Sequence, residues 1–156
     1  PVGKYPFIVY EWQYKGVKPN NELVVITSDN IDSNLMLRLI YGASDFSGEP
    51  YSTSYDELEQ LHFAVWKAQK EEYLMEAQQI IMFKLESLVS SQQGQVRAIQ
   101  NQLSKTTNER IKVMRQGQLE RLEQVFKDKQ ADLQTEIDRC DIIATKLATG
   151  ILHVEN

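Results

Sequence analysis

The longest stretch without strong helix-breaking residues constrains this sequence most. From Ser54 to Ala148 there is no proline, and the only glycines are Gly94 and Gly117. Because proline and glycine are the residues least favourable in a helix interior, the stretch predicts helix almost throughout. In its middle, Thr106-Thr107-Asn108-Glu109 has the form of a capping box, which predicts the start of a second helix. We therefore expect two long helices that fold back on each other as an antiparallel hairpin, which would project as an arm.

The first helix of this hairpin is predicted to begin at another capping box, Ser54-Tyr55-Asp56-Glu57. Apolar residues then recur at spacings of three and four, from Leu58 to Leu88, which is typical of a helix with one face in a core. The segment Ser90–Gly94 is the weak point. The helix either continues through Gly94 to Lys105 or is kinked or interrupted there.

The second helix carries a repeat of seven residues. The repeat consists of Leu119, Phe126, Leu133, Cys140 and Leu147. A strict seven-residue repeat favours left-handed supercoiling against a partner helix. It also predicts that the helix runs through Ala148 and ends at Thr149-Gly150.

The rest of the chain has strand and turn patterns. Residues 5–14 and 23–27 are rich in aromatic and β-branched side chains, and the turn-rich residues 15–21 between them predict a β-hairpin. A short helix is expected from the capping candidates of residues 29–33 to Gly42, followed by a loop over residues 43–53. The apolar run 151–154 is predicted to be a third strand of the same sheet.

These expectations together predict an α+β fold, with a small antiparallel sheet of about three strands at the base of a long antiparallel two-helix hairpin. We expect residues 1–156 to form a single domain. Residues 1–53 and 149–156 would form the sheet base with its short helix, and residues 54–148 the hairpin. Because the chain lacks an initiator Met, we interpret it as a piece of a larger protein.

Aromatic residues cluster in the first predicted strand: Tyr5, Phe7, Tyr10, Trp12 and Tyr14. They could stack on bases, as exposed aromatic residues on some sheets do. The favoured interpretation is that one face of the sheet is buried against Leu39, Ile40 and Trp66.

Composition restricts the classes of protein and partner. No apolar run approaches the length that spans a bilayer, roughly 20 residues, so no membrane segment is expected. The single cysteine, Cys140, allows no internal disulfide and fits a reducing, cytoplasmic setting. It is expected to act as a small buried apolar residue in the helical seam. The net charge of −5 argues against attraction of the whole surface to nucleic acid.

The charge is unevenly distributed, and the basic part coincides with the predicted hairpin turn. Residues 92–118 hold five cationic side chains against the single carboxylate of Glu109, a net charge of +4 that leaves −9 for the rest of the chain. The candidate nucleic-acid contacts are Arg97, Lys105, Arg110, Lys112 and Arg115. The alternative interpretation is a solvated helix turn with incidental charge.

No constellation of residues that could carry catalysis is evident in the sequence. Gly3-Lys4 is followed by Tyr5, so it does not match a phosphate-binding loop. His62 and His153 are far apart in the sequence and show no metal-ligand spacing. His62 is expected at the surface or at the edge of the core. We therefore expect no catalytic residue, metal site or cofactor in this chain.

Several segments resemble the C-terminal region of bacterial Swi/Snf-type, RapA-like ATPases, which are helicase-like. The segments are Asn108-Glu109-Arg110-Ile111, Gly117-Gln118-Leu119-Glu120, Leu133 and Gly150-Ile151-Leu152-His153-Val154. The resemblance implies an accessory domain of a DNA-translocating ATPase whose ATP and Mg²⁺ sites lie in upstream motor lobes. The implied partners are DNA, the motor lobes, or a protein such as RNA polymerase.

A second hypothesis needs no parent ATPase. The chain would then be a stand-alone coiled-coil module for protein–protein interaction, with a partner helix along exposed apolar side chains such as Tyr73, Met82 or Phe83. An independent enzyme is the least favoured hypothesis, because no site can be assembled from the sequence.

Overall fold

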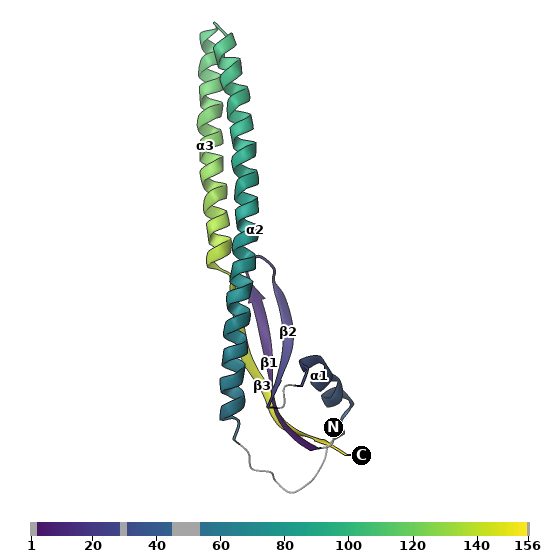
Figure 1. Ribbon diagram of the computed structural model, residues 1–156. Helices are drawn as coiled ribbons and strands as arrows, with labels where there is room; N and C mark the ends of the chain where they lie inside the picture. Colours follow the sequence, from purple (N-terminus) through teal and green to yellow (C-terminus); the bar gives the residue numbers. More distant parts are fainter. Residues whose placement is uncertain (1–2, 29–30, 45–53, 156) are drawn as a thin grey trace. The chain divides into compact units, whose positions relative to one another are not determined.

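The computed structural model describes residues 3–28, 31–44 and 54–155 and confirms the α+β fold (Figure 1). Its elements are β1 (Gly3–Lys15), β2 (Asn20–Thr27), α1 (Ser33–Gly42), α2 (Asp56–Lys105), α3 (Glu109–Asp138) and β3 (Asp141–Val154). The chain divides into two compact units. The sheet unit comprises Pro1–Tyr73 and Asp141–Asn156, and the hairpin unit comprises Leu74–Cys140. The first turns of α2 thus belong with the sheet, whereas the sequence placed them in the hairpin.

The sheet has three antiparallel strands, as predicted, and their order is β2-β1-β3. The pairing of β1 with β2 runs from Phe7 opposite Thr27 to Tyr14 opposite Asn20. Gly16 lies in the connection between these strands with a positive φ. A side chain at this residue would strain the backbone. In Figure 1 the long central strand lies between its two partners.

The third strand is much longer than predicted, and the prediction of helix through Ala148 is wrong. The helix α3 ends at Asp138, and β3 begins at Asp141 and spans 14 residues. The β-branched residues Ile142, Ile143 and Thr145 favour an extended backbone. Pairing with β1 decides the outcome: Ile142 lies opposite Tyr14 and its side chain is only 1% exposed.

The seven-residue repeat ends where α3 ends. Leu147, its last member, lies on β3 at a register shift, because Val9 pairs with Ala148 while Tyr10 pairs with Lys146. This extra residue in one strand is a β-bulge. The Leu147 side chain is consequently exposed rather than part of a helical seam.

The two long helices begin where the capping boxes predicted, but the capping hydrogen bonds differ from those predicted. The Ser54 hydroxyl accepts a hydrogen bond from the amide of Asp56 at 3.4 Å rather than from Glu57. At the hairpin turn the cap is Asn108, whose side chain accepts from the amide of Arg110 at 3.0 Å, and not Thr106. Asparagine directly before a helix is as good a cap as threonine, so the sequence allowed either choice.

The two remaining helix predictions have clear outcomes. The helix α2 is uninterrupted through Gly94 to Lys105. The short helix α1 is confirmed, and the side chain of Asp32 accepts from the amide of Leu35 at 3.1 Å. Residues 29–30 of its predicted capping segment, and residues 45–53 of the predicted loop, lie outside the described part of the chain.

Both faces of the sheet carry buried side chains. On one face, Tyr5, Val25 and Leu152 form a core with Met36 of α1, and Ile40 packs against it. Leu39 is exposed, so that part of the predicted contact is wrong. The opposite face carries Ile8, Tyr10 and Trp12 and lies against the first turns of α2. Most of the aromatic cluster therefore packs in the core of the sheet unit, as the favoured interpretation predicted.

The hairpin unit has a thinner interior. The seam residues Leu119, Phe126 and Leu133 are only half-buried, and no residue of α3 is fully buried. The ammonium of Lys84 on α2 pairs with the carboxylate of Glu136 on α3 at 3.2 Å. Buried side chains in this unit include Ala77, Ile81 and Cys140, whereas the seam residues of α3 stay partly in contact with water.

Candidate nucleic-acid interface and hairpin groove

The five predicted contact residues lie around the turn of the helical hairpin. Arg97 and Lys105 belong to the last turns of α2, and Arg110, Lys112 and Arg115 to the first turns of α3. The two groups are brought together because α2 ends at Lys105 and α3 begins four residues later behind its Asn108 cap. The basic stretch thus coincides with the turn, as predicted.

The five side chains fall into two groups by their contacts. Arg97, Lys105 and Arg110 are exposed, and none of them has an ion-pair partner among the described residues. We call these three the free cations. Lys112 lies 3.5 Å from the Glu109 carboxylate. Arg115 donates from Nη1 to Oε1 of Gln118 at 2.9 Å.

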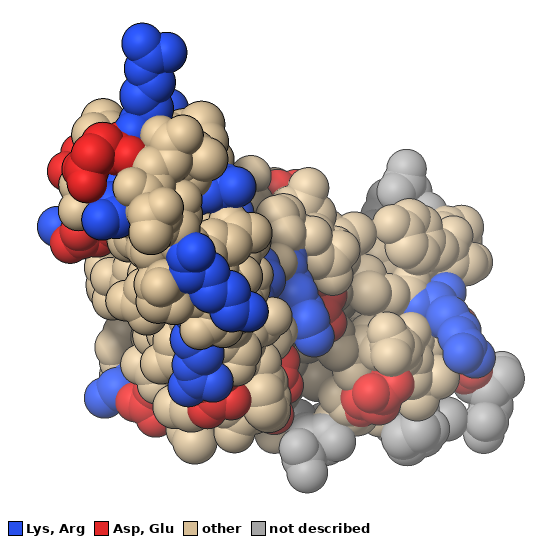
Figure 2. Space-filling model, turned by 90° about the horizontal axis from the view of Figure 1, so that it is seen from above, with Lys and Arg blue, Asp and Glu red and all other residues tan. Residues whose placement is uncertain are grey.

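The basic side chains do not form one continuous patch in the view of Figure 2. Lys and Arg are scattered there among uncharged and acidic side chains. Such an arrangement offers single charges that can each meet a phosphate. It does not resemble a pocket that reads a base edge, because base readout needs several converging hydrogen-bonding groups.

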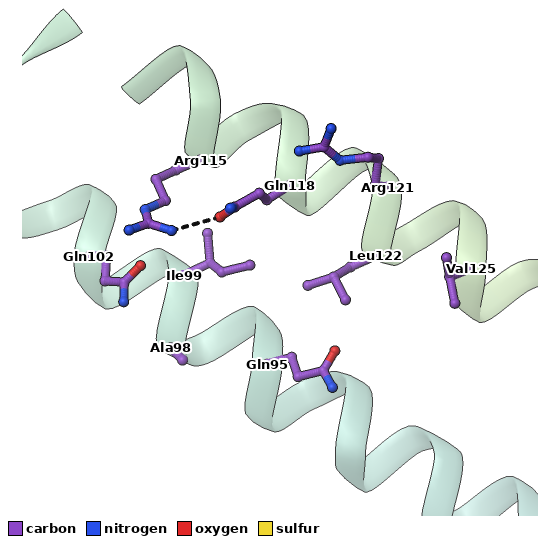
Figure 3. Close-up of a pocket in the computed structure, with 9 residues that line it drawn as sticks. All are labelled: Gln95, Ala98, Ile99, Gln102, Arg115, Gln118, Arg121, Leu122 and Val125. Atoms are coloured by element: carbon purple, nitrogen blue, oxygen red, sulfur yellow. Dashed lines mark hydrogen bonds between the residues drawn. The ribbon is translucent and has the colours of Figure 1, made fainter. Parts of the chain in front are cut away.

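A second feature of the hairpin unit is an open hollow of about 500 Å³ between α2 and α3 (Figure 3). We call it the hairpin groove, and its lining residues are Gln95, Ala98, Ile99, Gln102, Arg115, Gln118, Arg121, Leu122 and Val125. Figure 3 shows Ile99 and Leu122 between the two helices, where they form an apolar floor. Sequence reasoning missed this groove, because no pattern within either helix shows which side chains meet across the hairpin.

The guanidinium of Arg115 is only partly hydrogen-bonded at this groove. Its Nη1 is engaged by Gln118, but its Nε is buried without a hydrogen-bond acceptor. A buried donor without an acceptor is unfavourable by roughly 1–3 kcal/mol. A ligand that brought an oxygen to this side chain could relieve that cost.

In the sheet unit, His62 is buried in the core rather than placed at its edge as predicted. Its ring stacks on Tyr10 with centroids 3.5 Å apart, and its Nε2 accepts from Nε1 of Trp12 at 2.9 Å. The side chain is only 7% exposed. This burial lowers the pKa of His62 below its ordinary value. Through these contacts the His62 ring has a structural role in the core.

The remaining chemistry-bearing residues also have structural surroundings. Cys140 is buried, and its thiol donates to the backbone oxygen of Glu136 at 3.2 Å. The thiol is thus part of the local packing at the end of α3. Within residues 3–28, 31–44 and 54–155, no three His, Cys, Asp or Glu side chains are grouped so that they could hold a metal ion.

The apolar side chains proposed for a partner helix have different environments. Met82 is 58% exposed and Phe83 is 70% exposed, as that hypothesis requires. Tyr73 was assigned wrongly, because it is buried and its hydroxyl donates to the backbone oxygen of Lys15 at 3.1 Å. The sequence could not show that the β1–β2 connection covers this part of α2.

Comparison with known proteins found no matching family model, no matching curated protein and no matching solved structure. The resemblance to Swi/Snf-type ATPases therefore stays a prediction. Among the helices that the structure describes, none combines the length and the apolar character needed to cross a bilayer.

Proposed function

We propose that this chain is a non-catalytic accessory domain of a Swi/Snf-type DNA-translocating ATPase, and that it contacts DNA through the turn of its helical hairpin. The observation that carries the proposal is the presence of three free cations, Arg97, Lys105 and Arg110, on both sides of the hairpin turn in a chain whose net charge is −5. Cations without a protein partner are available to phosphates.

The helix dipole distinguishes the cation at the end of α2 from those at the start of α3. A cation near a helix C-terminus stabilises the helix dipole, which is a sufficient structural reason for Lys105. Arg110 and Lys112 lie in the first turn of α3, where a cation opposes the dipole. Lys112 has a structural partner in Glu109, but Arg110 has no ion-pair partner among the described residues, which supports a role for Arg110 in binding an anion.

The resemblance supplies the remaining parts of the proposal. ATP and Mg²⁺ would be bound by the parent's motor lobes, and this domain would contact those lobes or a protein partner as well as DNA. Its setting would be the cytoplasm.

The proposal is tested by DNA binding of the full chain to a short duplex at low salt, followed by fluorescence anisotropy. Reversing the free cations with Arg97→Glu, Lys105→Glu and Arg110→Glu is expected to weaken binding at least tenfold. It should also reduce the slope of log K against log salt by about 2–3, because each lost phosphate contact removes about 0.9. In the parent ATPase, the same triple variant should lower DNA-stimulated hydrolysis.

A matched control carries the same charge change on the same unit. Lys127→Glu, Lys129→Glu and Arg139→Glu alter three exposed cations far along the sequence from the turn. This control should keep the DNA affinity within about threefold, since screening limits the reach of surface charge to ~10 Å at 0.1 M salt. Equal losses in both triple variants would show that only net charge matters and would overturn the assignment to the turn.

A second candidate function is a protein–protein module, and the exposure of Met82 and Phe83 favours it. Large apolar side chains that stay exposed on a helix are typical of a surface that a partner helix covers. Sedimentation over the micromolar range should then show association that Met82→Gln with Phe83→Gln abolishes. A strict monomer whose sedimentation the double variant leaves unchanged would contradict self-association through this surface.

A further inference from the structure

The hairpin groove has a charge pattern that selects its occupant. Its floor is apolar, with Ile99 and Leu122 between the helices and Val125 beside them. Its rim holds two arginines, Arg115 and Arg121, and three glutamines, but no carboxylate. A surface of this kind is complementary to an apolar ligand that carries negative charge along its edges.

We propose that the hairpin groove is a docking site for an acidic amphipathic helix of a partner protein. The apolar face of that helix covers Ile99, Leu122 and Val125, and its carboxylates pair with Arg115 and Arg121. None of the free cations lines this groove, although Arg115, one of the five predicted nucleic-acid contacts, does. The occupant completes the two-helix hairpin as a third helix.

The arginine side chains are available for this pairing. Arg121 is exposed and has no ion-pair partner among the described residues. Arg115 has only the neutral oxygen of Gln118 as an acceptor, and its Nε has none. A carboxylate accepts two parallel hydrogen bonds from a guanidinium, which an amide oxygen cannot do. A partner carboxylate would therefore displace the Gln118 oxygen from Nη1 of Arg115.

The spacing of the two arginines sets the pattern of the occupant. Arg121 follows Arg115 by six positions on α3, which corresponds to about 9 Å along the helix axis. A helix lying along the groove would need acidic residues six or seven positions apart to reach both. On the adjoining face of the same helix, apolar residues at spacings of three and four would contact the apolar floor of the groove.

The shape of the hairpin unit also favours a helix. The seam between α2 and α3 is half-buried, so the side chains at its edge can still lose contact with water when a third helix packs into the groove. The volume of the groove is about 500 Å³. Pockets of this size accept several side chains. Duplex DNA has no apolar surface of matching shape in its phosphate backbone, so it would leave the floor uncovered.

The proposal is tested with a synthetic helical peptide and the full chain. The probe is a labelled peptide of six helical turns with three leucines at spacings of four and three along one face, and a pair of glutamates seven positions apart along each edge of that face. Its binding is measured by fluorescence anisotropy at physiological salt. Ala98→Trp, at an exposed position of the groove, should fill the hollow and weaken binding at least tenfold, and Arg121→Glu should do the same.

Two controls isolate the groove. Arg139→Glu makes the same charge change outside the groove and should leave peptide affinity unchanged. A peptide with lysine in place of each glutamate should not bind. Absence of binding up to about 1 mM acidic peptide, equal binding of the lysine peptide, or full binding to Ala98→Trp would each overturn the proposal.

The outcome can be distinguished from that of the DNA proposal. Ala98→Trp changes no charge and should keep the DNA affinity of the chain. Arg110→Glu alone, a reversal of one free cation outside the groove lining, should keep peptide affinity within about threefold at this salt concentration. If DNA competes with the peptide and Ala98→Trp weakens DNA binding equally, the groove is part of the DNA site and the helix proposal is wrong.

Discussion

The sheet unit and the hairpin unit stabilise themselves by different means. In the sheet unit, side chains such as Ile8 and Met36 have no exposed surface, and buried hydrogen bonds such as Trp12 to His62 join strand and helix. In the hairpin unit, α3 has no fully buried residue, and its contacts with α2 are a half-buried seam and the exposed Lys84–Glu136 ion pair. The first unit is a packed core, and the second is mostly surface.

This difference shows where structure and function are separated in the chain. A core with close packing tolerates little change, because each removed methylene leaves a cavity. A two-helix hairpin exposes most of its residues, so charged and apolar side chains can be chosen for partners. The free cations and the hairpin groove both lie in the hairpin unit.

The two units can be followed separately in solution. Both tryptophans, Trp12 and Trp66, belong to the sheet unit, where the indole of Trp66 donates to the backbone oxygen of Ile142 at 2.9 Å. Tryptophan fluorescence therefore reports the sheet unit alone. Circular dichroism at the helical minimum reports chiefly the hairpin unit, because most of the helical residues belong to it.

The largest effect is expected from truncating a buried residue of the sheet. Ile8 has no exposed surface. Ile8→Ala should therefore lower the free energy of unfolding of the sheet unit by about 2–5 kcal/mol. Leu119→Ala in the half-buried seam should cost less, on the order of 1 kcal/mol, because part of that side chain already contacts water. Urea unfolding followed by fluorescence and by circular dichroism measures both. Equal losses would refute the contrast between core and surface.

A smaller effect, of opposite sign in the two units, is expected from replacing glycine by alanine. At Gly150 on β3 an added Cβ would lie 2.7 Å from Cζ of the Phe7 ring. Gly150→Ala should therefore destabilise the sheet unit by about 1–3 kcal/mol. At Gly94 nothing lies within 4 Å of an added Cβ. Gly94→Ala should stabilise α2 by about 0.5–1 kcal/mol.

The urea midpoints should therefore move in opposite directions. Gly150→Ala should lower the fluorescence midpoint, and Gly94→Ala should raise the circular dichroism midpoint. Adding Phe7→Leu to Gly150→Ala should recover part of the loss, since it shortens the clashing side chain. A destabilised Gly94→Ala variant would show that α2 needs flexibility at this residue.

The smallest effect is a pH dependence confined to the sheet unit. Burial lowers the pKa of His62 in the folded protein. The unfolded chain therefore takes up the proton first as the pH falls through about 6.5. The free energy of unfolding should fall below that pH, by at most about 1.4 kcal/mol per pH unit for one proton. Above it both states are neutral at this residue, and the stabilisation is complete.

A conservative variant checks that His62 is the cause. His62→Gln keeps an acceptor for Trp12 but has no titrating group, so its urea midpoint by fluorescence should vary less between pH 7.5 and 5.5 than that of the parent chain. The circular dichroism midpoint of the hairpin unit should not follow the same curve. An unchanged pH dependence in His62→Gln would assign the effect to another group.

Several features were predictable because their causes lie close together in the sequence. The absence of proline from Ser54 to Ala148, the cap of α1 at Asp32 and the turn before Glu109 all act within a few residues. The pairing of the first two strands was predictable for the same reason, since their connection is short. The position of the five basic residues around the hairpin turn followed directly from these elements.

Features that depend on distant partners were not predictable. Residues 141–148 have an apolar pattern that fits a helix or a strand, and the backbone hydrogen bonds of β1 select the strand. The burial of Tyr73 depends on the backbone of Lys15 and Lys18, which are far away in the sequence. The spacing of apolar residues within one segment contains no information about contacts with distant residues.

The sequence by itself determined the local elements, the α+β class and the basic character of the hairpin turn, because propensity, capping and charge are properties of neighbouring residues. Only the tertiary structure decided that α3 ends at Asp138, that His62 lies in a core, and that Arg115 and Arg121 share a groove with Ile99. Each of these depends on which surfaces meet, and burial and hydrogen bonding across the fold then outweigh local preference.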